Sequence, residues 1–310
     1  MKTLKKILIA ILLILAVLFV FIELTWNKKF EAPYPQLKAS TDSAVIARGR
    51  YLAYGPAHCA SCHVPMDKAM EVEKGNDIPM SGGWELSIPP GTFRAPNLTP
   101  DKETGIGNYT DADLARTLRY MVNKNGHCVF PFMPFAEMSD EDLVAVISFI
   151  RSQPAVKHEV EKSKLSFLGK ALMTFGVIKP EGTIGTPPKA VKIDSTIEYG
   201  NYIANYIANC RGCHTNRDLK TGEFIGKPFA GGFVMPDESP TGEAGVTFVT
   251  PNLTPDPQTG HIYDWTEQQF IDRFKKGRVH EKSPMPWGSF ARMNDLELKA
   301  VYRYLRSLKA

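Results

Sequence analysis

The feature that most constrains this chain is a five-residue pattern that occurs twice, as CASCH at residues 59–63 and as CRGCH at residues 210–214. Covalent haem attachment needs two thiols at a fixed separation, one for each vinyl group, and an imidazole that can reach the iron. The pattern satisfies both demands and predicts two covalently bound haem c groups. The expected thioether and proximal ligand residues are Cys59, Cys62 and His63 in the first copy, and Cys210, Cys213 and His214 in the second.

Other uses of paired cysteines fit the sequence less well. A redox dithiol usually accompanies a βαβ pattern, which is missing here. A zinc site would need two further ligands for each pentad, and the second half offers only His261 and His280. Four of the five cysteines lie in the pentads, which leaves Cys128 alone, so a disulfide framework is not expected.

The rest of the chain repeats along with the pentads. APNLTPDKETGIG at 95–107 matches TPNLTPDPQTGHI at 250–262, and SGGW at 81–84 matches AGGF at 230–233. Two copies of a unit longer than about 100 residues suggest two globular domains rather than a solenoid. The expected division is an N-terminal membrane anchor at 1–26, cytochrome c domain 1 at 41–155, a linker at 156–193 and cytochrome c domain 2 at 194–310.

Each copy is expected to be built of helices and loops, which makes the fold all-α: two tandem cytochrome c-like domains preceded by one transmembrane helix. Residues 42–57 and 195–209 have helical apolar spacing and lead into the pentads. Capping patterns predict the start of two further helices in each copy, at Thr110, Ser139, Thr266 and Asn294. The last helices carry buried stripes at Leu143, Val146, Ile147 and Ile150, and at Leu298, Val301, Tyr302 and Leu305.

An apolar run at Ile7–Ile22 follows three lysines at the N-terminus. A secretory signal has an apolar region of about 7–15 residues and a small-residue cleavage site. This run is longer and no such site follows. A single spanning helix needs about 17–25 residues, and Ile7–Trp26 provides them, with Trp26 at the interface. We therefore expect an uncleaved anchor. The apolar segment 165–180 in the linker is expected to pack between the domains, with contact to the membrane surface as the alternative.

The repeat also selects the sixth ligands of the two irons. Met133 follows Cys59 by 74 positions, Met285 follows Cys210 by 75, and both precede proline. Methionine opposite histidine is a common haem ligand pair, so we expect Met133 and Met285 to complete the two sites. Met235 also precedes proline but aligns with Leu86, and we expect it to be no ligand.

Three residues near these methionines leave alternatives open. His127, Cys128 or His280 could bind iron in one redox state. The simpler reading is that the histidines are polar loop residues and that Cys128 is a small buried hydrophobe, since it has no counterpart in the second copy. His58 is expected at the surface. The net charge of +4 is too small and too dispersed to indicate nucleic acid as a partner.

The motifs together resemble those of the cytochrome c subunits of bacterial membrane-bound alcohol and gluconate dehydrogenases. The resemblance runs over about residues 41–310 and rests on GRYLAYGPAHCASCHVP, the SGGW and PNLTP segments, PFMPFAEMSDEDLVAVISFI and their counterparts in the second copy. It implies haem attached at each pentad, Met133 and Met285 as ligands, and electron transfer from a periplasmic dehydrogenase to membrane quinone or another acceptor. Those relatives commonly carry three haem units, whereas this chain has two pentads.

The expected protein is therefore an electron carrier and not an enzyme. Redox proteins on either side would be its partners, with a dehydrogenase subunit among them, and nucleic acid would not. Because haem of this type is attached outside the cytoplasm, we expect a single-pass protein of the inner membrane whose haem domains face the periplasm. The alternative is a dihaem oxidoreductase, such as a peroxidase or a thiosulfate-oxidising enzyme, with an altered first haem site at His127 and Cys128.

Overall fold

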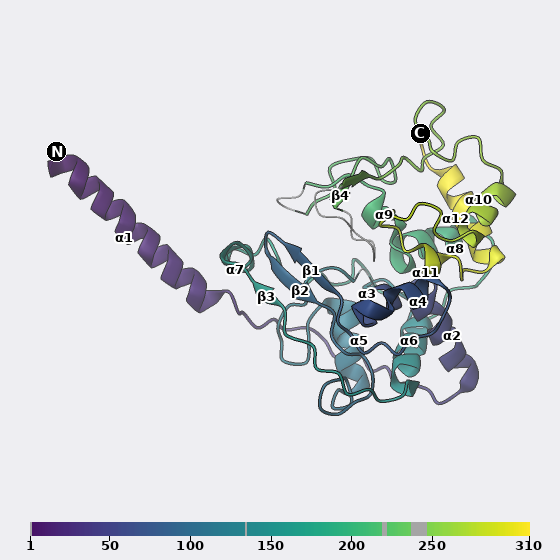
Figure 1. Ribbon diagram of the computed structural model, residues 1–310, viewed down its shortest axis with the longest axis horizontal. Helices are drawn as coiled ribbons and strands as arrows, with labels where there is room; N and C mark the ends of the chain where they lie inside the picture. Colours follow the sequence, from purple (N-terminus) through teal and green to yellow (C-terminus); the bar gives the residue numbers. More distant parts are fainter. Residues whose placement is uncertain (1, 134, 219–221, 237–246) are drawn as a thin grey trace.

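A computed structural model describes residues 2–133, 135–218, 222–236 and 247–310. One long helix, α1 (Lys2–Thr25), projects from a body of shorter helices, small sheets and loops (Figure 1). It is long and apolar enough to cross a membrane, although by length and composition alone a signal sequence passes the same test. Pro134 of the first Met-Pro motif, and residues 219–221 and 237–246 of the expected second domain, lie outside the described residues.

The body contains two similar sets of elements. The first set is α2 (Ser43–Tyr54), α3 (Ala60–His63), η1 (Met66–Lys68), α4 (Ala69–Glu73), β1 (Glu85–Ile88), β2 (Gly91–Arg94), α5 (Asp111–Tyr120) and α6 (Asp140–Ser152). Between the sets lie β3 (Lys164–Leu165) and α7 (Phe167–Thr174). The second set is α8 (Ile197–Tyr202), the π turn η2 (Ile203–Ile207), α9 (Cys210–Cys213), β4 (Val234–Pro236), β5 (Thr247–Val249), α10 (Glu267–Lys275), α11 (Trp287–Phe290) and α12 (Asp295–Ser307).

In each copy the first helix crosses the last helix at a glycine. A Cβ atom on Gly49 of α2 would lie 1.8 Å from the Ala145 carbonyl oxygen of α6. A Cβ atom on Gly200 of α8 would lie 2.0 Å from the Ala300 carbonyl oxygen of α12. Both distances are impossible for real atoms, so only glycine permits this close approach. The expected apolar stripes of α6 and α12 are confirmed on the buried side of the crossings, with Tyr302 half-buried.

The helix starts predicted from capping patterns are also confirmed. Thr110 and Asp113 form a reciprocal capping box at α5, and Thr266 and Gln269 form one at α10. The strands were not predicted. β1, β2 and β3 form a three-stranded antiparallel sheet, and β4 pairs with β5. These strands are only two to four residues long, too short to produce a clear alternating pattern in the sequence.

The two copies are joined by a reciprocal exchange of tyrosines. Tyr202, eight positions before its pentad, accepts a hydrogen bond from the N-cap N–H of α6 (2.9 Å) and donates one to Asp142 (2.9 Å). Tyr51, eight positions before the first pentad, accepts a bond from the N-cap N–H of α12 (2.9 Å) and donates one to Glu297. Each copy therefore helps to cap the last helix of the other.

A half-buried arginine links the two ends of this exchange. Arg48 lies 2.9 Å from the Asp142 carboxylate and 3.2 Å from the carboxylate of Glu297, whose side chain is fully buried. The Tyr199 hydroxyl donates a further bond to Glu297 at 2.7 Å. Burial and the nearby Glu297 charge raise the pKa of Tyr51 and of Tyr199, so both hydroxyls keep their protons and act as donors.

Two expectations about location were wrong. His58 is not on the free surface, because its ring packs edge-on against Phe290 of the other copy at 5.5 Å between centroids. The segment at 165–180 does not pack between the copies. Its helix, α7, lies against the end of α1 and beside β3 (Figure 1). Its apolar residues match the apolar surface of α1, a long-range pairing that local sequence does not reveal.

The tyrosine exchange leads to a stability prediction. Tyr51→Phe and Tyr202→Phe each remove one hydroxyl and leave a buried carboxylate and an N-cap N–H without that partner. We expect each change to lower the free energy of unfolding by about 1–3 kcal/mol, as measured by chemical denaturation of the purified protein in detergent. Tyr263→Phe, at an exposed tyrosine, is the matched control. Equal stability of all three variants would show that the exchange does not hold the copies together.

Candidate functional site

Each pentad forms a single helical turn that gathers its two thiols and its imidazole. The His63 N–H donates to the Cys59 carbonyl oxygen at 2.9 Å, and the His214 N–H donates to that of Cys210 at 2.8 Å. Residues four apart lie on one face of a helix, so the first thiol and the imidazole are neighbours in both copies. The residue before each turn, His58 or Asn209, has a left-handed backbone with φ of 40° and 51°.

The two histidines are oriented by the same contact. His63 Nδ1 lies 2.9 Å from the Pro96 carbonyl oxygen, and His214 Nδ1 lies 3.0 Å from that of Pro251. A carbonyl oxygen only accepts, so Nδ1 must carry the proton, and the lone pair is then on Nε2. Metal-bound histidines in proteins are fixed in this way. Both imidazoles are therefore set to present Nε2 as a ligand.

Burial favours the neutral form that a ligand needs. It lowers the pKa of His63 and of His214 below the ordinary value for histidine. Burial also raises the pKa of the Cys59 and Cys210 thiols to about 12. All four groups are therefore uncharged near neutral pH, which suits attachment to an apolar macrocycle rather than capture of a bare ion.

The repeated glycine and PNLTP segments explain how the acceptor carbonyls are placed. The Gly82 N–H donates to the His63 carbonyl at 2.7 Å, and the Gly231 N–H donates to the His214 carbonyl at 2.8 Å. Both glycines have positive φ, of 78° and 70°. A Cβ atom would lie 2.6 Å from the Pro96 carbonyl carbon at Gly82, and 2.5 Å from that of Pro251 at Gly231. Only glycine lets the two loops touch here.

The PNLTP loops are also held internally by matching bonds. The Asn97 side-chain oxygen accepts from the Thr99 N–H at 2.9 Å, and Asn252 accepts from the Thr254 N–H at 2.8 Å. The Asp101 carboxylate then turns the chain by accepting from the Thr104 N–H at 2.7 Å. Sequence analysis found these segments as repeats but assigned them no role. Their recurrence after each pentad, with Asn97 38 positions after Cys59 and Asn252 42 positions after Cys210, was the available signal.

The side chains present fit haem c better than a metal ion. Both turns combine two thiols with one imidazole whose Nε2 is left to bind iron. In the part of the chain that the structure describes, no three side chains of His, Cys, Asp or Glu gather as a metal-ion site would require. These residues therefore do not indicate a zinc site.

The two candidate methionines lie in different loops. Met133 and Met285 are both half-buried and pack against the core. The Met285 carbonyl oxygen accepts from the Trp287 N–H at 2.8 Å and from the Arg278 guanidinium at 3.2 Å. Beside Met133, the Phe132 ring lies 5.4 Å from that of Phe93, centroid to centroid, within an aromatic cluster. Ligation of iron by either methionine stays a prediction.

The alternative ligands show ordinary loop contacts. His127 Nδ1 lies 3.3 Å from the Lys28 carbonyl oxygen, and the His280 side chain is exposed. Burial raises the pKa of Cys128 to about 12, so its sulfur is a thiol near neutral pH and donates weakly to the Val129 carbonyl. Met235 lies in β4, where it pairs with Phe248 of β5.

Comparison with known proteins now defines the class. Residues 46–154 match the Cytochrome c family, so this part of the chain is a cytochrome c domain. A fructose dehydrogenase cytochrome subunit of Gluconobacter japonicus is 28% identical over 90% of this chain and 55% of its own length. The cytochrome c subunit of a quinone-dependent alcohol dehydrogenase of Gluconobacter oxydans is 29% identical over 87% and 56%.

A third relative is closer in length. The diheme cytochrome c-type of Cereibacter sphaeroides is 29% identical over 81% of this chain and 82% of its own length. The chain thus resembles the cytochrome c subunits of sugar and alcohol dehydrogenases, which are electron-transfer subunits and not the catalytic ones. It spans little more than half of the length of those subunits. The match of residues 46–154 to the Cytochrome c family indicates covalently bound haem c in that part of the chain.

The glycine contact beside His63 gives a test of the loop architecture. Gly82→Ala places a methyl group against the Pro96 backbone, whereas Gly75→Ala, also at positive φ (95°), meets no atom within 4 Å. Left-handed backbone should cost each variant about 1–2 kcal/mol, and Gly82→Ala should lose clearly more. The readouts are the free energy of unfolding and the haem bound per chain. Identical losses in both variants would mean that the contact does not position His63.

Proposed function

We propose that this chain is a membrane-anchored dihaem cytochrome c that carries electrons from a periplasmic donor, such as a dehydrogenase, to a respiratory acceptor. The observation that supports it most is the duplicated orientation of His63 and His214 by proline carbonyls. The resemblance to cytochrome subunits of dehydrogenases supports the class of donor. The diheme relative supports two haem groups.

In this proposal the chain attaches haem through Cys59, Cys62, Cys210 and Cys213. His63 and Met133 bind the first iron, and His214 and Met285 bind the second. Each haem, when bound, supplies a one-electron iron couple. The protein fixes its ligands, excludes water from them and sets the distance between the two sites. Methionine as the sixth ligand raises the potential compared with a second histidine, which suits an electron acceptor late in a chain of carriers.

The location follows from the same proposal. Haem c is attached outside the cytoplasm, so the body belongs in the periplasm, and α1 crosses the inner membrane with its N-terminus inside. Charge alone barely orients α1, because Lys2, Lys5 and Lys6 precede the apolar run while Lys28 and Lys29 follow it, so the direction rests on haem attachment. Anchoring keeps the protein near membrane-bound redox partners at high effective concentration.

Ligand replacement tests the methionine assignments. We expect Met133→Ala and Met285→Ala each to open one haem, so that the reduced protein binds carbon monoxide at one site per chain. The methionine-to-iron charge-transfer band of the oxidised protein should fall by about half in each variant, because one of two such bonds is lost. Carbon monoxide difference spectra and near-infrared absorption measure these effects.

The wild-type protein and Met235→Ala are the controls. Met235 precedes proline in the second copy as Met285 does, and we expect its replacement to leave both spectra unchanged. Rapid carbon monoxide binding by the wild-type protein would contradict two closed sites. It would favour the dihaem enzyme, and peroxide and sulfur substrates would then be assayed.

The Met285 loop is held from the other copy of the repeat. Arg278 donates to the Met285 carbonyl at 3.2 Å and pairs with Glu73 of α4 at 3.0 Å. Both partners of the pair are largely buried, and Glu73 also accepts from the Gly288 N–H at 3.1 Å. The first copy therefore helps to position the proposed ligand of the second haem.

Two arginines at the interface allow a matched test of this positioning. Arg292 pairs with Asp77 of the first copy, as Arg278 pairs with Glu73, but its bonds run to Asp77 and Asn76 rather than to the Met285 loop. We expect Arg278→Gln to weaken the charge-transfer band of the second haem and to shift its potential. Arg292→Gln should affect stability only. Equal spectra in the two variants would contradict a positioning role for Arg278.

A further inference from the structure

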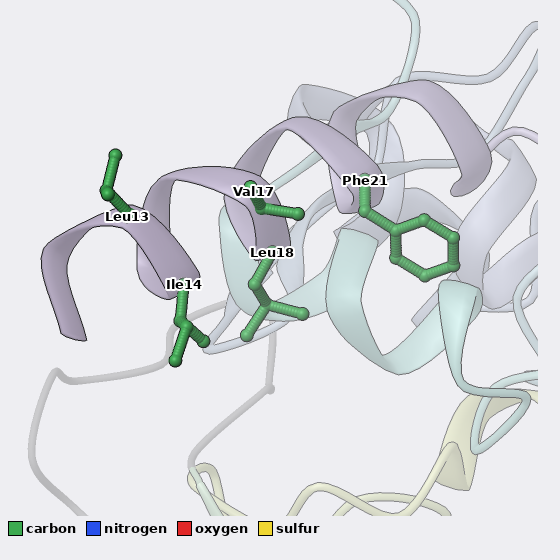
Figure 2. A pocket seen from close by; sticks show the side chains of 5 residues that line it. All are labelled: Leu13, Ile14, Val17, Leu18 and Phe21. Atoms are coloured by element: carbon green, nitrogen blue, oxygen red, sulfur yellow. The ribbon is translucent and has the colours of Figure 1, made fainter. Parts of the chain in front are cut away.

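Helix α7 is fixed to the outer end of α1. The Phe167 ring stacks on the Phe19 ring with 5.3 Å between centroids and 18° between planes. The Lys28 ammonium donates to the Thr174 carbonyl oxygen at 2.5 Å. Ile22 is only 2% exposed, while most of α1 is open to its surroundings. Leu13, Ile14, Val17, Leu18 and Phe21, for example, line a shallow open hollow along the helix (Figure 2). The two helices therefore share one environment where they meet.

An ion pair in this contact explains an acidic residue in the apolar helix. Glu23 lies 2.6 Å from the Lys170 ammonium of α7, and both side chains are half-buried. An unpaired charge at the edge of a membrane is costly, and such residues are found paired. Lys170 also lies 5.5 Å from the centre of the Trp26 ring. α7 thus supplies the cation that lets α1 carry Glu23.

The other side of α7 is fixed to the body. The Ser166 N–H donates to the Pro90 carbonyl oxygen at 2.9 Å, and its hydroxyl donates to the Pro89 carbonyl at 2.7 Å. β3, directly before α7, pairs with β2. Helix α7 therefore contacts α1 on one side and the first copy of the repeat on the other. It cannot leave α1 without losing contacts on both sides.

Apolar side chains remain exposed on α7 and just after it. They are Phe167, Leu168, Phe175 and Val177, each between 45% and 61% exposed. Phe19 precedes Trp26 by seven residues, which is about 10 Å along a helix axis. If Trp26 marks the membrane interface, Phe167 lies about 10 Å below it. Interfacial helices sit about 5–10 Å deep.

We propose that α7 lies in the outer interfacial layer of the lipid bilayer alongside α1, with Leu168 against acyl chains and Phe175 at the level of Trp26, since Thr174 contacts Thr25 and Lys28. This rests on the proposed function, because it requires α1 to span the membrane. The body is then docked on the bilayer by two helices and does not swing on a single tether. Figure 1 shows α7 and the β1–β2 hairpin of the first copy near the end of α1, so in this proposal that hairpin is the part of the body that meets the membrane.

Spin labels in the intact protein test this placement. The full-length holoprotein, carrying Cys128→Ser, is placed in nanodiscs of phosphatidylcholine and phosphatidylglycerol. Single labels are attached at Leu168→Cys, Phe175→Cys, Ile184→Cys and Leu13→Cys. Collision of each label with oxygen and with a water-soluble nickel chelate is then measured. Ile184 is the matched control, since it is apolar and 91% exposed but lies in the linker beyond α7.

We expect the label at 168 to collide with the chelate several-fold less often than the label at 184, and to favour oxygen as the label at 13 does. The label at 175 should fall between those at 168 and 184. Water-like behaviour at 168 and 175 with lipid-like behaviour at 13 would overturn the docking of α7 and leave the anchor intact. Water-like behaviour at 13 as well would show that the anchor itself fails.

Discussion

The hydrogen bond from each histidine to a proline carbonyl is the contact on which both sites depend. It fixes the tautomer, and with it the nitrogen that is left for iron. Its geometry depends in turn on Gly82 and Gly231, where the backbone of one loop touches the other without room for a side chain. The two Cys-x-x-Cys-His turns supply the thiols, but the loops that contain the proline carbonyls orient the imidazoles. Without this hydrogen bond the turn would fix neither the orientation nor the tautomer of the imidazole.

The interface between the copies adds a second level of constraint. The exchange of Tyr51 and Tyr202 is reciprocal, yet the charges around it are not, because Arg48 has Tyr199 as its counterpart. The single arginine is shared by two carboxylates, and tyrosine hydroxyls supply the remaining donors to them. Elsewhere along the interface, Glu73 and Arg278 connect the first copy to the Met285 loop. The Met285 loop of the second copy is thus held in part by a residue of the first copy.

Local patterns in the sequence predicted local structure well. Caps at Thr110 and Thr266 and the stripes of α6 and α12 depend on neighbours a few residues apart, and they are where they were expected. The pentads predict haem attachment from equally local spacing, and that assignment stays a prediction. The placement of His58, the packing of α7 and the tyrosine exchange all depend on partners far away in the chain. A tyrosine hydroxyl that caps a helix of the other copy produces no recognisable pattern in the residues around that tyrosine.

The glycines at the helix crossings and in the loops lie between these cases. Gly49 and Gly200 recur at one position of the repeat, as do Gly82 and Gly231, so the sequence marks them as required. It does not show what they touch. The same holds for the methionine loops. The repeat selects Met133 and Met285, but it does not show where their side chains point.

The tyrosine exchange has a consequence for how such a chain behaves when it is cut. The link between the copies runs through exposed residues near Ile184, a region where proteases act readily. Because each half caps a helix of the other through buried contacts, a nick there would not release two independent cytochromes. The fragments would stay together as a non-covalent pair. On these contacts we expect the two copies to unfold together, and a foreign domain could replace one half only if it supplied the residues that reach across.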